Sequence, residues 1–112
     1  MNNEVIELLI SIGVPKKTAK TLVYLSTGED LASQNIQSAT DLRQPEVSIA
    51  LRELENRGWV TKKNYKKEGK GRPIQLYTLT VPLDNAVNVL VKSKKSEIER
   101  MEKNINRLQQ IV

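Results

Sequence analysis

The sequence predicts a small α+β protein, mainly α-helical, in which a helical domain with one β-hairpin precedes a long C-terminal helix. Three observations support this fold class. Apolar residues recur at helical spacing through the first half of the chain, residues 59–81 change to a strand-like pattern around a Gly-rich turn, and residues 84–112 carry an apolar heptad pattern. A chain of 112 residues is long enough for one such domain, residues 1–82, followed by the helix, residues 83–112.

Four helices are expected before the hairpin: residues 3–12, a second near Pro15, a third from Ser33 to Leu42, and a fourth near Pro45. Proline suits the first turn of a helix because its missing N–H would be unpaired there anyway. Glycine can take the left-handed conformation that ends a helix, and Gly13, Gly28 and Gly58 are placed to do so. Residues 29–32 are expected to form a short connector, which could be a bridge of extended chain.

The third and fourth helices are expected to pack one apolar side each against the core. Ile36 and Ala39 would face inward from the third helix. In the fourth, the inward positions follow the i, i+3, i+4, i+7 rule and are Val47, Ala50, Leu51 and Leu54. The opposite side of the fourth helix then presents polar residues and one isoleucine: Gln44, Glu46, Ser48, Ile49, Arg52 and Asn56.

The positive charge is concentrated in one stretch of the chain. The protein has 18 Lys and Arg against 13 Asp and Glu. Residues 43–72 hold nine basic and four acidic residues, so this stretch carries the whole excess of +5. A polyanion such as nucleic acid is the partner that such a stretch favours. The alternative is a solvated lysine surface that aids solubility.

The composition argues against an enzyme. The chain has no Cys and no His, so disulfides, thiolate zinc sites and imidazole bases are excluded. A metal-dependent nuclease would need clustered carboxylates, and Asp41, Glu46, Glu53 and Glu55 have no evident metal-binding spacing. We therefore expect no metal and no cofactor. The apolar run over residues 5–14 is too short and too interrupted to span a membrane, and the N-terminus lacks a secretion signal, so a cytoplasmic protein is expected.

The C-terminal helix carries a heptad seam with one lysine in it. Its positions are spaced alternately by four and three residues: Val87, Val91, Lys94, Ile98, Met101, Ile105, Leu108 and Val112. At about 1.5 Å per residue the helix would be roughly 43 Å long, too long to lie wholly on a domain of this size. A second copy of the chain is the simplest partner, so a homodimer is expected. The alternative is a helix folded back onto its own domain.

The last three of the four expected helices, followed by a basic hairpin, have the element order of a winged helix-turn-helix. Residues 41–60 (DLRQPEVSIALRELENRGWV) and the hairpin GKGRPIQLYTLTVPL resemble the winged helix-turn-helix transcriptional regulators, especially archaeal ones of the TrmB, MarR and ArsR kind. The resemblance covers about residues 14–82, and its most specific part runs from Pro45 to Val60, where those families place the recognition helix and the start of the wing. The sequence has no counterpart of the effector domain of the larger sugar-sensing regulators, so no sugar ligand is expected.

The resemblance implies a dimeric, sequence-specific regulator of transcription that binds double-stranded DNA. Arg52 could pair with guanine, and Gln44 and Ser48 with base edges or phosphates. Ile49 either contacts a thymine methyl or lies at the rim of the core. The candidate DNA contacts are Arg43, Gln44, Glu46, Ser48, Ile49, Arg52, Lys62, Lys66, Lys67, Lys70 and Arg72.

The basic residues near the hairpin have two interpretations each. Arg72 suits a narrow minor groove and the lysines suit phosphates, whereas a flexible solvated turn would also contain Gly and Lys. Arg57 is either a phosphate contact or an ion pair with Glu53. Trp59 and Tyr77 are expected to pack between hairpin and helices, and Tyr65 is left open. The competing function is a protein-interaction module of a larger complex, and a small-molecule effector remains possible although no residue indicates one.

Overall fold

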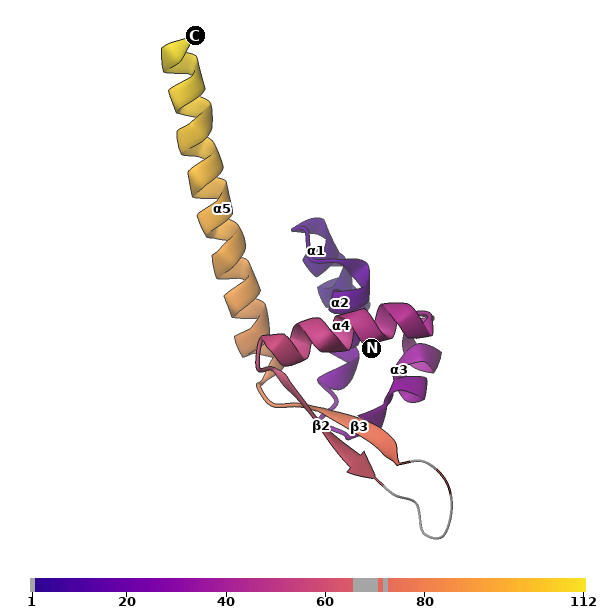
Figure 1. The fold of residues 1–112 in the computed structure, drawn as a ribbon. Coiled ribbons are helices and arrows are strands. Elements are labelled where there is room, and N and C mark those ends of the chain that lie inside the picture. The colour runs from indigo at the N-terminus through magenta and orange to yellow at the C-terminus, as the bar shows by residue number, and fades with distance from the viewer. Residues whose placement is uncertain (1, 66–70, 72) are drawn as a thin grey trace.

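The computed structural model describes residues 2–65, 71 and 73–112 of the chain. In chain order the elements are α1 (Asn3–Ser11), α2 (Lys16–Leu25), β1 (Leu31–Ala32), α3 (Ser33–Thr40), α4 (Gln44–Asn56), β2 (Val60–Tyr65), β3 (Ile74–Leu79) and α5 (Leu83–Ile111). The first four helices form one body, the hairpin of β2 and β3 extends from one end of it, and α5 leaves in another direction (Figure 1). The predicted α+β, mainly α-helical class is confirmed.

The first helix packs only one side against the core. Asn2 caps it, because its side-chain oxygen accepts a hydrogen bond from the Val5 N–H at 3.3 Å. Ile6 and Leu9 are buried, whereas Leu8 on the other side of the helix is exposed. The helix ends at Ser11, one residue earlier than expected, and Gly13 follows with a φ of +99°, which a side chain would strain.

The third helix is shorter than the sequence predicted. It ends at Thr40 because Asp41 takes the left-handed conformation with a φ of +59°, so Leu42 lies beyond the helix, buried in the turn. At the other end Ala32, not Ser33, is the capping residue, and its N–H donates to the Asn35 side chain at 3.0 Å.

The inward side of α3 also differs from the expectation. Ile36 is buried as expected, but Ala39 is exposed and Thr40 is buried in its place. Thr40 can be buried because its hydroxyl donates to the Ile36 carbonyl at 2.6 Å and accepts from the Leu42 N–H at 3.3 Å. A threonine satisfied in this way costs little in the core.

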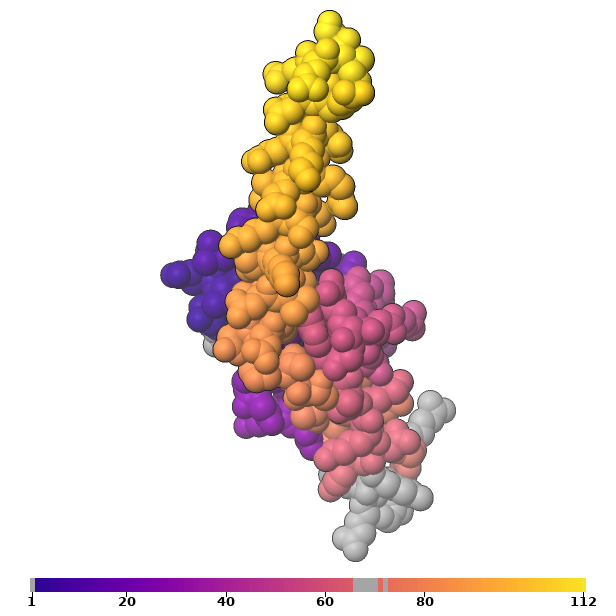
Figure 2. Space-filling view, turned by 90° about the vertical axis from the view of Figure 1, so that its left-hand side faces the viewer, coloured from indigo at the N-terminus to yellow at the C-terminus, as the bar shows by residue number. Residues whose placement is uncertain are grey.

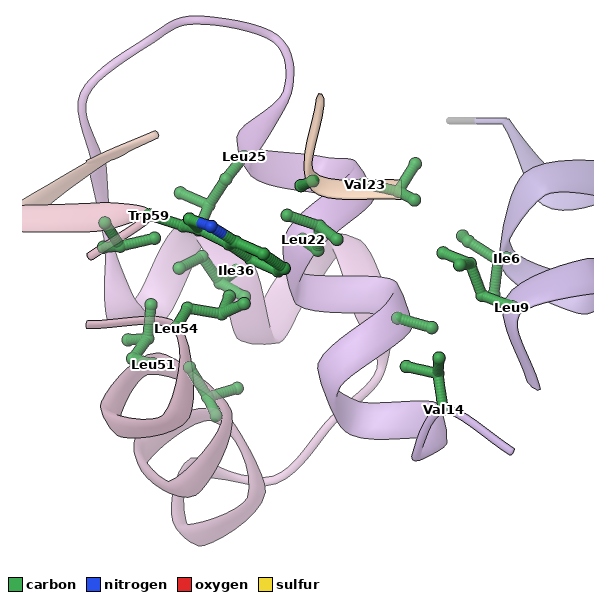
Figure 3. Close-up of a cluster of buried hydrophobic side chains, with 14 of the residues drawn as sticks. Ile6, Leu9, Val14, Leu22, Val23, Leu25, Ile36, Leu51, Leu54 and Trp59 are labelled. Atoms are coloured by element: carbon green, nitrogen blue, oxygen red, sulfur yellow. The ribbon is translucent and has the colours of Figure 1, made fainter. Parts of the chain in front are cut away.

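The core lies between α2, α3 and α4 and the start of the hairpin. The four predicted inward positions of α4 are all buried, with Pro45 in its first turn. Figure 3 shows Leu51 and Leu54 directed toward Ile36 and Leu22, with the ring of Trp59 lying over them. A hydrogen bond from the Thr18 hydroxyl to the Glu53 carboxylate, 2.7 Å long, also joins α2 to α4. These contacts fix the orientation of α4.

The sheet is antiparallel with strand order β1-β3-β2. Val60 lies opposite Leu79 and Tyr65 opposite Ile74, so the hairpin expected over residues 59–81 is confirmed with strands slightly shorter than that range. The third strand is β1, where Leu31 lies opposite Tyr77, and the connector expected at residues 29–32 therefore ends in a short strand. This pairing attaches the hairpin to the segment that precedes α3.

The last helix begins on the core and then leaves it. Ala86 and Leu90 are buried, so the core extends past the boundary expected between residues 82 and 83, and that division into domains stays a prediction. The molecule measures 71 × 25 × 24 Å, and its radius of gyration of 17.7 Å exceeds the value of about 13 Å for a compact chain of this length. Figure 2 shows the C-terminal half of α5 projecting from the body.

Candidate nucleic-acid interface

One side of α4 is free of the core and carries the candidate contacts. Gln44 and Arg52 are exposed, Ser48 is half-buried between them, and Ile49 has 45% of its surface exposed. Residues spaced by three and four positions share one side of a helix, so these four side chains lie close together. The Gln44 side-chain amide donates to the Ser48 hydroxyl oxygen at 3.0 Å, which orders the first turns of this side.

The start of α4 is held by the helix's own residues. The Glu46 carboxylate accepts a hydrogen bond from the Arg43 N–H at 3.0 Å and so satisfies a donor that the helix leaves unpaired. Arg43 is exposed at this end with its side chain outside the core. Glu46 thus has a structural role at the helix start, and its role as a DNA contact stays a prediction.

Two lysines at the base of the hairpin face acidic partners. Lys62 Nζ lies 3.9 Å from Glu55 Oε2 on α4, a distance at the limit of an ion pair. Lys63 Nζ lies 2.6 Å from Asp30 Oδ2, and the Thr78 hydroxyl donates to the other oxygen of Asp30 at 2.5 Å. The hydrogen bond from Lys63, together with that from Thr78, lowers the pKa of Asp30. Asp30 therefore joins the segment before β1 to both strands of the hairpin.

The tip of the hairpin carries most of the predicted phosphate contacts. Lys66, Lys67, Lys70 and Arg72 lie outside the described residues. The strands that lead to the tip are described, and their register brings Tyr65 and Ile74 opposite one another at its base. The position of the hairpin beside α4 is therefore known, and contacts by its tip stay predictions.

A groove of about 700 Å³ runs between α3, α4 and β3. None of the described residues that line it carries a charge. Those with polar side chains are Ser33, Gln34, Asn35, Gln44, Ser48, Gln75 and Tyr77. Because Gln44 and Ser48 also belong to the free side of α4, the groove lies next to that side.

Trp59 and Tyr77 both pack against the core, as expected. Trp59 is buried, and the Arg57 guanidinium lies 4.9 Å from the centre of its ring. Arg57 and Glu53 do not form the ion pair considered from the sequence: Glu53 accepts from Thr18, and Arg57 lies over the Trp59 ring. Tyr77 packs partly buried against the core, whereas Tyr65 is exposed.

The heptad seam of α5 packs against the body in its first turns and is exposed in its last turns. Val87 packs against the core of its own chain, and Lys94 bonds Glu97 at 3.3 Å while its Nζ approaches Gly13. Val91 is half-buried. Beyond residue 97 the seam side chains are exposed by about half or more: Ile98 55%, Met101 61%, Ile105 48% and Leu108 62%. The first part of the seam therefore contacts the chain itself, and the second part projects beyond the body (Figure 2).

Solved structures share this arrangement. No family model and no curated protein matches the sequence, but many solved chains match the fold. A possible transcriptional regulator from Methanosarcina mazei Go1 superposes with a TM-score of 0.61 at 10% identity, over 96% of this chain and 88% of that one. The archaeal chromatin protein TrmBL2 gives a TM-score of 0.67 at 16% identity, over 98% of this chain and 41% of that one. This chain thus spans about two fifths of TrmBL2.

A third similar structure is MepR of Staphylococcus aureus, a transcription regulator of the multidrug efflux pump MepA. It superposes with a TM-score of 0.55 at 18% identity, over 96% of this chain and 87% of that one. The fold is a winged helix-turn-helix. In this fold α3 and α4 occupy the positions of the helix-turn-helix, α4 occupies that of the recognition helix, and the hairpin occupies that of the wing. These three neighbours are described as a possible transcriptional regulator, a chromatin protein and a transcription regulator.

Part of the surface beside the recognition helix is not predicted from the sequence. Ser33, Gln34 and Gln75 line the groove next to Gln44 and Ser48, yet they are absent from the candidate contacts. Basic residues mark a candidate contact in a sequence, and these three are uncharged. Their proximity depends on β1 pairing with β3, which joins residues more than 40 positions apart, and no local pattern in the sequence indicates that pairing.

Two further observations concern metal binding and membrane insertion. Among the described residues, no three acidic side chains come together as possible metal ligands. In the same part of the chain, no helix combines the length and the apolar composition needed to cross a membrane.

Proposed function

We propose that this protein is a homodimeric regulator of transcription that binds double-stranded DNA in a sequence-specific manner. The recognition helix α4 enters the major groove, and the wing follows the backbone or the adjacent minor groove. One observation carries the proposal: the uncovered polar side of α4 and the wing fall within the single stretch that holds the chain's entire excess of positive charge. A winged helix that binds only protein gains nothing from positive charge concentrated on these two elements.

The side chains of α4 suggest how bases are read. Arg52 is exposed midway along the helix, where its two parallel N–H groups can meet the O6 and N7 atoms of guanine. Ile49, exposed beside it, can contact a thymine methyl. Gln44 and Ser48, bonded to each other, offer further donors to base edges or phosphates. A MepR variant was solved bound to an oligodeoxyribonucleotide, and its fold matches this chain at a TM-score of 0.53 and 24% identity, over 92% of this chain and 71% of that one.

The dimer is proposed to form through the free half of α5. Ile98, Met101, Ile105 and Leu108 make a continuous apolar stripe in the continuation of the side that packs on the core. An exposed stripe of this kind is unfavourable in water and is covered when a second copy packs against it. Two linked winged domains would then bind two half-sites, which raises the affinity through effective concentration.

The test is selection of bound sequences from a random duplex library, using the full chain and its Arg52→Ala variant. We expect the full chain to enrich a two-part site with related halves. Arg52→Ala is expected to bind this site about 1 to 3 kcal/mol more weakly and to lose selectivity at one position in each half.

The matched control is Arg100→Ala, which removes the same charge from an exposed position of α5. This variant should enrich the same site as the unmodified chain. If the unmodified chain enriched no sequence and bound no duplex, the protein-interaction function would replace the one proposed.

A further inference from the structure

Gln44 is the first residue of α4, and the residues around it hold its backbone in place. Pro45 restricts the conformation of the residue that precedes it. The Glu46 carboxylate accepts from the Arg43 N–H at 3.0 Å, which closes the turn of chain that contains Gln44. In helix-turn-helix proteins the N-terminal residues of the recognition helix are those that reach base edges. The position of Gln44 therefore suits a base contact.

The side chain of Gln44 is held as well, by Ser48 one turn further along the helix. Gln44 Nε2 donates to Ser48 Oγ at 3.0 Å. Ser48 is half-buried and Gln44 is exposed, so the serine fixes the orientation of an amide that would otherwise rotate in solvent. A glutamine held in this way loses less conformational freedom when it binds a base.

The bond to Ser48 determines which hydrogen-bonding groups Gln44 has left. A glutamine amide has two N–H donors and one carbonyl oxygen that accepts. Ser48 takes one of the donors, and no described residue donates to Gln44 Oε1. Gln44 therefore offers one donor and one acceptor, side by side.

Adenine is the base whose major-groove edge matches this pair of groups. It presents the N6 amino group, a donor, beside N7, an acceptor, whereas guanine presents two acceptors, cytosine a donor and thymine an acceptor. A glutamine amide with both N–H groups free can also donate to the two acceptors of guanine. We propose, on the basis of the DNA-binding function proposed for this protein, that Gln44 reads adenine and that Ser48 excludes guanine by occupying the second donor. Ser48 is thus a positioning residue, which sets the base preference through Gln44.

The spacing along α4 also limits where this adenine lies. Arg52 follows Gln44 by two steps of four residues, so both side chains lie on the same side of the helix. At a rise of about 1.5 Å per residue the two positions are about 12 Å apart along the axis, which corresponds to about three or four base pairs. The adenine should therefore lie within about four base pairs of the guanine proposed for Arg52.

The test is selection of bound sequences from a random duplex library with the full chain and three variants of it. The full chain should enrich adenine over guanine about tenfold at one position of each half-site. Ser48→Ala frees the second donor, so this ratio should fall to about threefold or less while the other positions keep their preferences. Ser48→Thr keeps the hydroxyl and should keep the ratio. Gln44→Glu has only acceptors, so the same position should change from adenine to cytosine.

The matched control is Gln110→Glu, which makes the same change from amide to carboxylate at an exposed position of α5. This variant should enrich the site of the unmodified chain. Melting temperatures show whether each variant keeps its fold. A serine with only a structural role in the helix would, when replaced, weaken binding to every base equally and leave the ratio of adenine to guanine unchanged.

The outcomes separate the base preference from the proposed function. If Ser48→Ala keeps the full ratio, or if Gln44→Glu keeps adenine, the proposed reading of adenine is overturned although the protein binds DNA. An enriched site without a position that prefers adenine would overturn it too. Should Ser48→Ala melt earlier than the unmodified chain, Gln44→Glu, which leaves the serine in place, decides by the same criterion. If the unmodified chain enriches no sequence, the proposed function itself fails.

Discussion

Asp30 shows how one exposed residue can position the wing. It lies just before β1, yet its two carboxylate oxygens bond Lys63 on β2 and Thr78 on β3. The contact therefore crosses all three strands of the sheet. Thr78 is 48 positions from Asp30 along the chain, and Lys63 is one of nine basic residues in its stretch, so no sequence pattern distinguishes this pairing from a solvated charge.

Replacing Asp30 with asparagine should destabilise the folded protein at neutral pH. The pKa of Asp30 is lowered in the folded state, so its carboxylate stabilises the fold above the unfolded pKa of about 3.9, and this contribution is lost as pH falls through the folded pKa. Melting temperatures measured across this pH range should therefore show a difference between Asp30→Asn and the unmodified chain at pH 7 that narrows below about pH 4.

Glu29→Gln is the matched control, since it removes the same charge from the exposed neighbouring position. Its melting temperature should follow that of the unmodified chain. A pH-independent difference between Asp30→Asn and the unmodified chain would show that the carboxylate charge is not what holds the strands.

At the scale of the elements, local sequence patterns predicted most of the fold. The four inward residues of α4 and the hairpin follow periodicities that depend on nearest neighbours, and both were confirmed. The end of α3 could not be predicted because it depends on Asp41 adopting a left-handed conformation, which asparagine and glycine adopt more readily. The groove beside α4 could not be predicted either, since it exists only once β3 is paired with β1.

The wing and the recognition helix should differ in how salt affects the binding of their variants. If Lys66, Lys67 and Lys70 only neutralise phosphates, replacing them with alanine should weaken binding to all duplexes. It should also reduce the slope of log affinity against log salt concentration by roughly 0.9 for each lysine that binds a phosphate. Arg52→Ala should instead weaken binding mainly to the selected operator. Salt titrations of both variants on operator and scrambled duplex make the comparison.

The unmodified chain provides the reference values for the slope of log affinity against log salt concentration and for the preference for operator over scrambled duplex. Equal weakening on both duplexes for Arg52→Ala, combined with a loss of base preference in the wing variant, would mean that the two elements have exchanged roles.

At the scale of the whole molecule, α5 determines the shape. Its first turns bury Ala86 and Leu90 in the core, and its last turns extend away from the body. The heptad pattern predicted the length and apolar side of this helix. It could not predict where the helix leaves its own domain, because Val91 and Ile98 occupy equivalent heptad positions and differ only in what lies next to them.

A test of dimerisation must therefore spare the first turns of α5. Deleting the helix after Leu83 would expose the core, so we choose Met101→Glu with Ile105→Glu in the full chain, beyond the contacts with the body. Two charges in an apolar seam cannot be covered by a partner without a large desolvation cost, so the variant should be a monomer. Its winged domain should remain folded. Light scattering measures the mass directly.

The control for the seam variant is Ser96→Glu with Gln110→Glu, which adds the same charge on the opposite side of α5 and should leave the dimer intact. A dimer that survives the seam variant would place the interface elsewhere. The monomer should also bind the selected operator more weakly than the unmodified chain, because the two winged domains that bind its half-sites are no longer linked. Equal affinity of monomer and dimer for the operator would show that the linkage contributes nothing to binding.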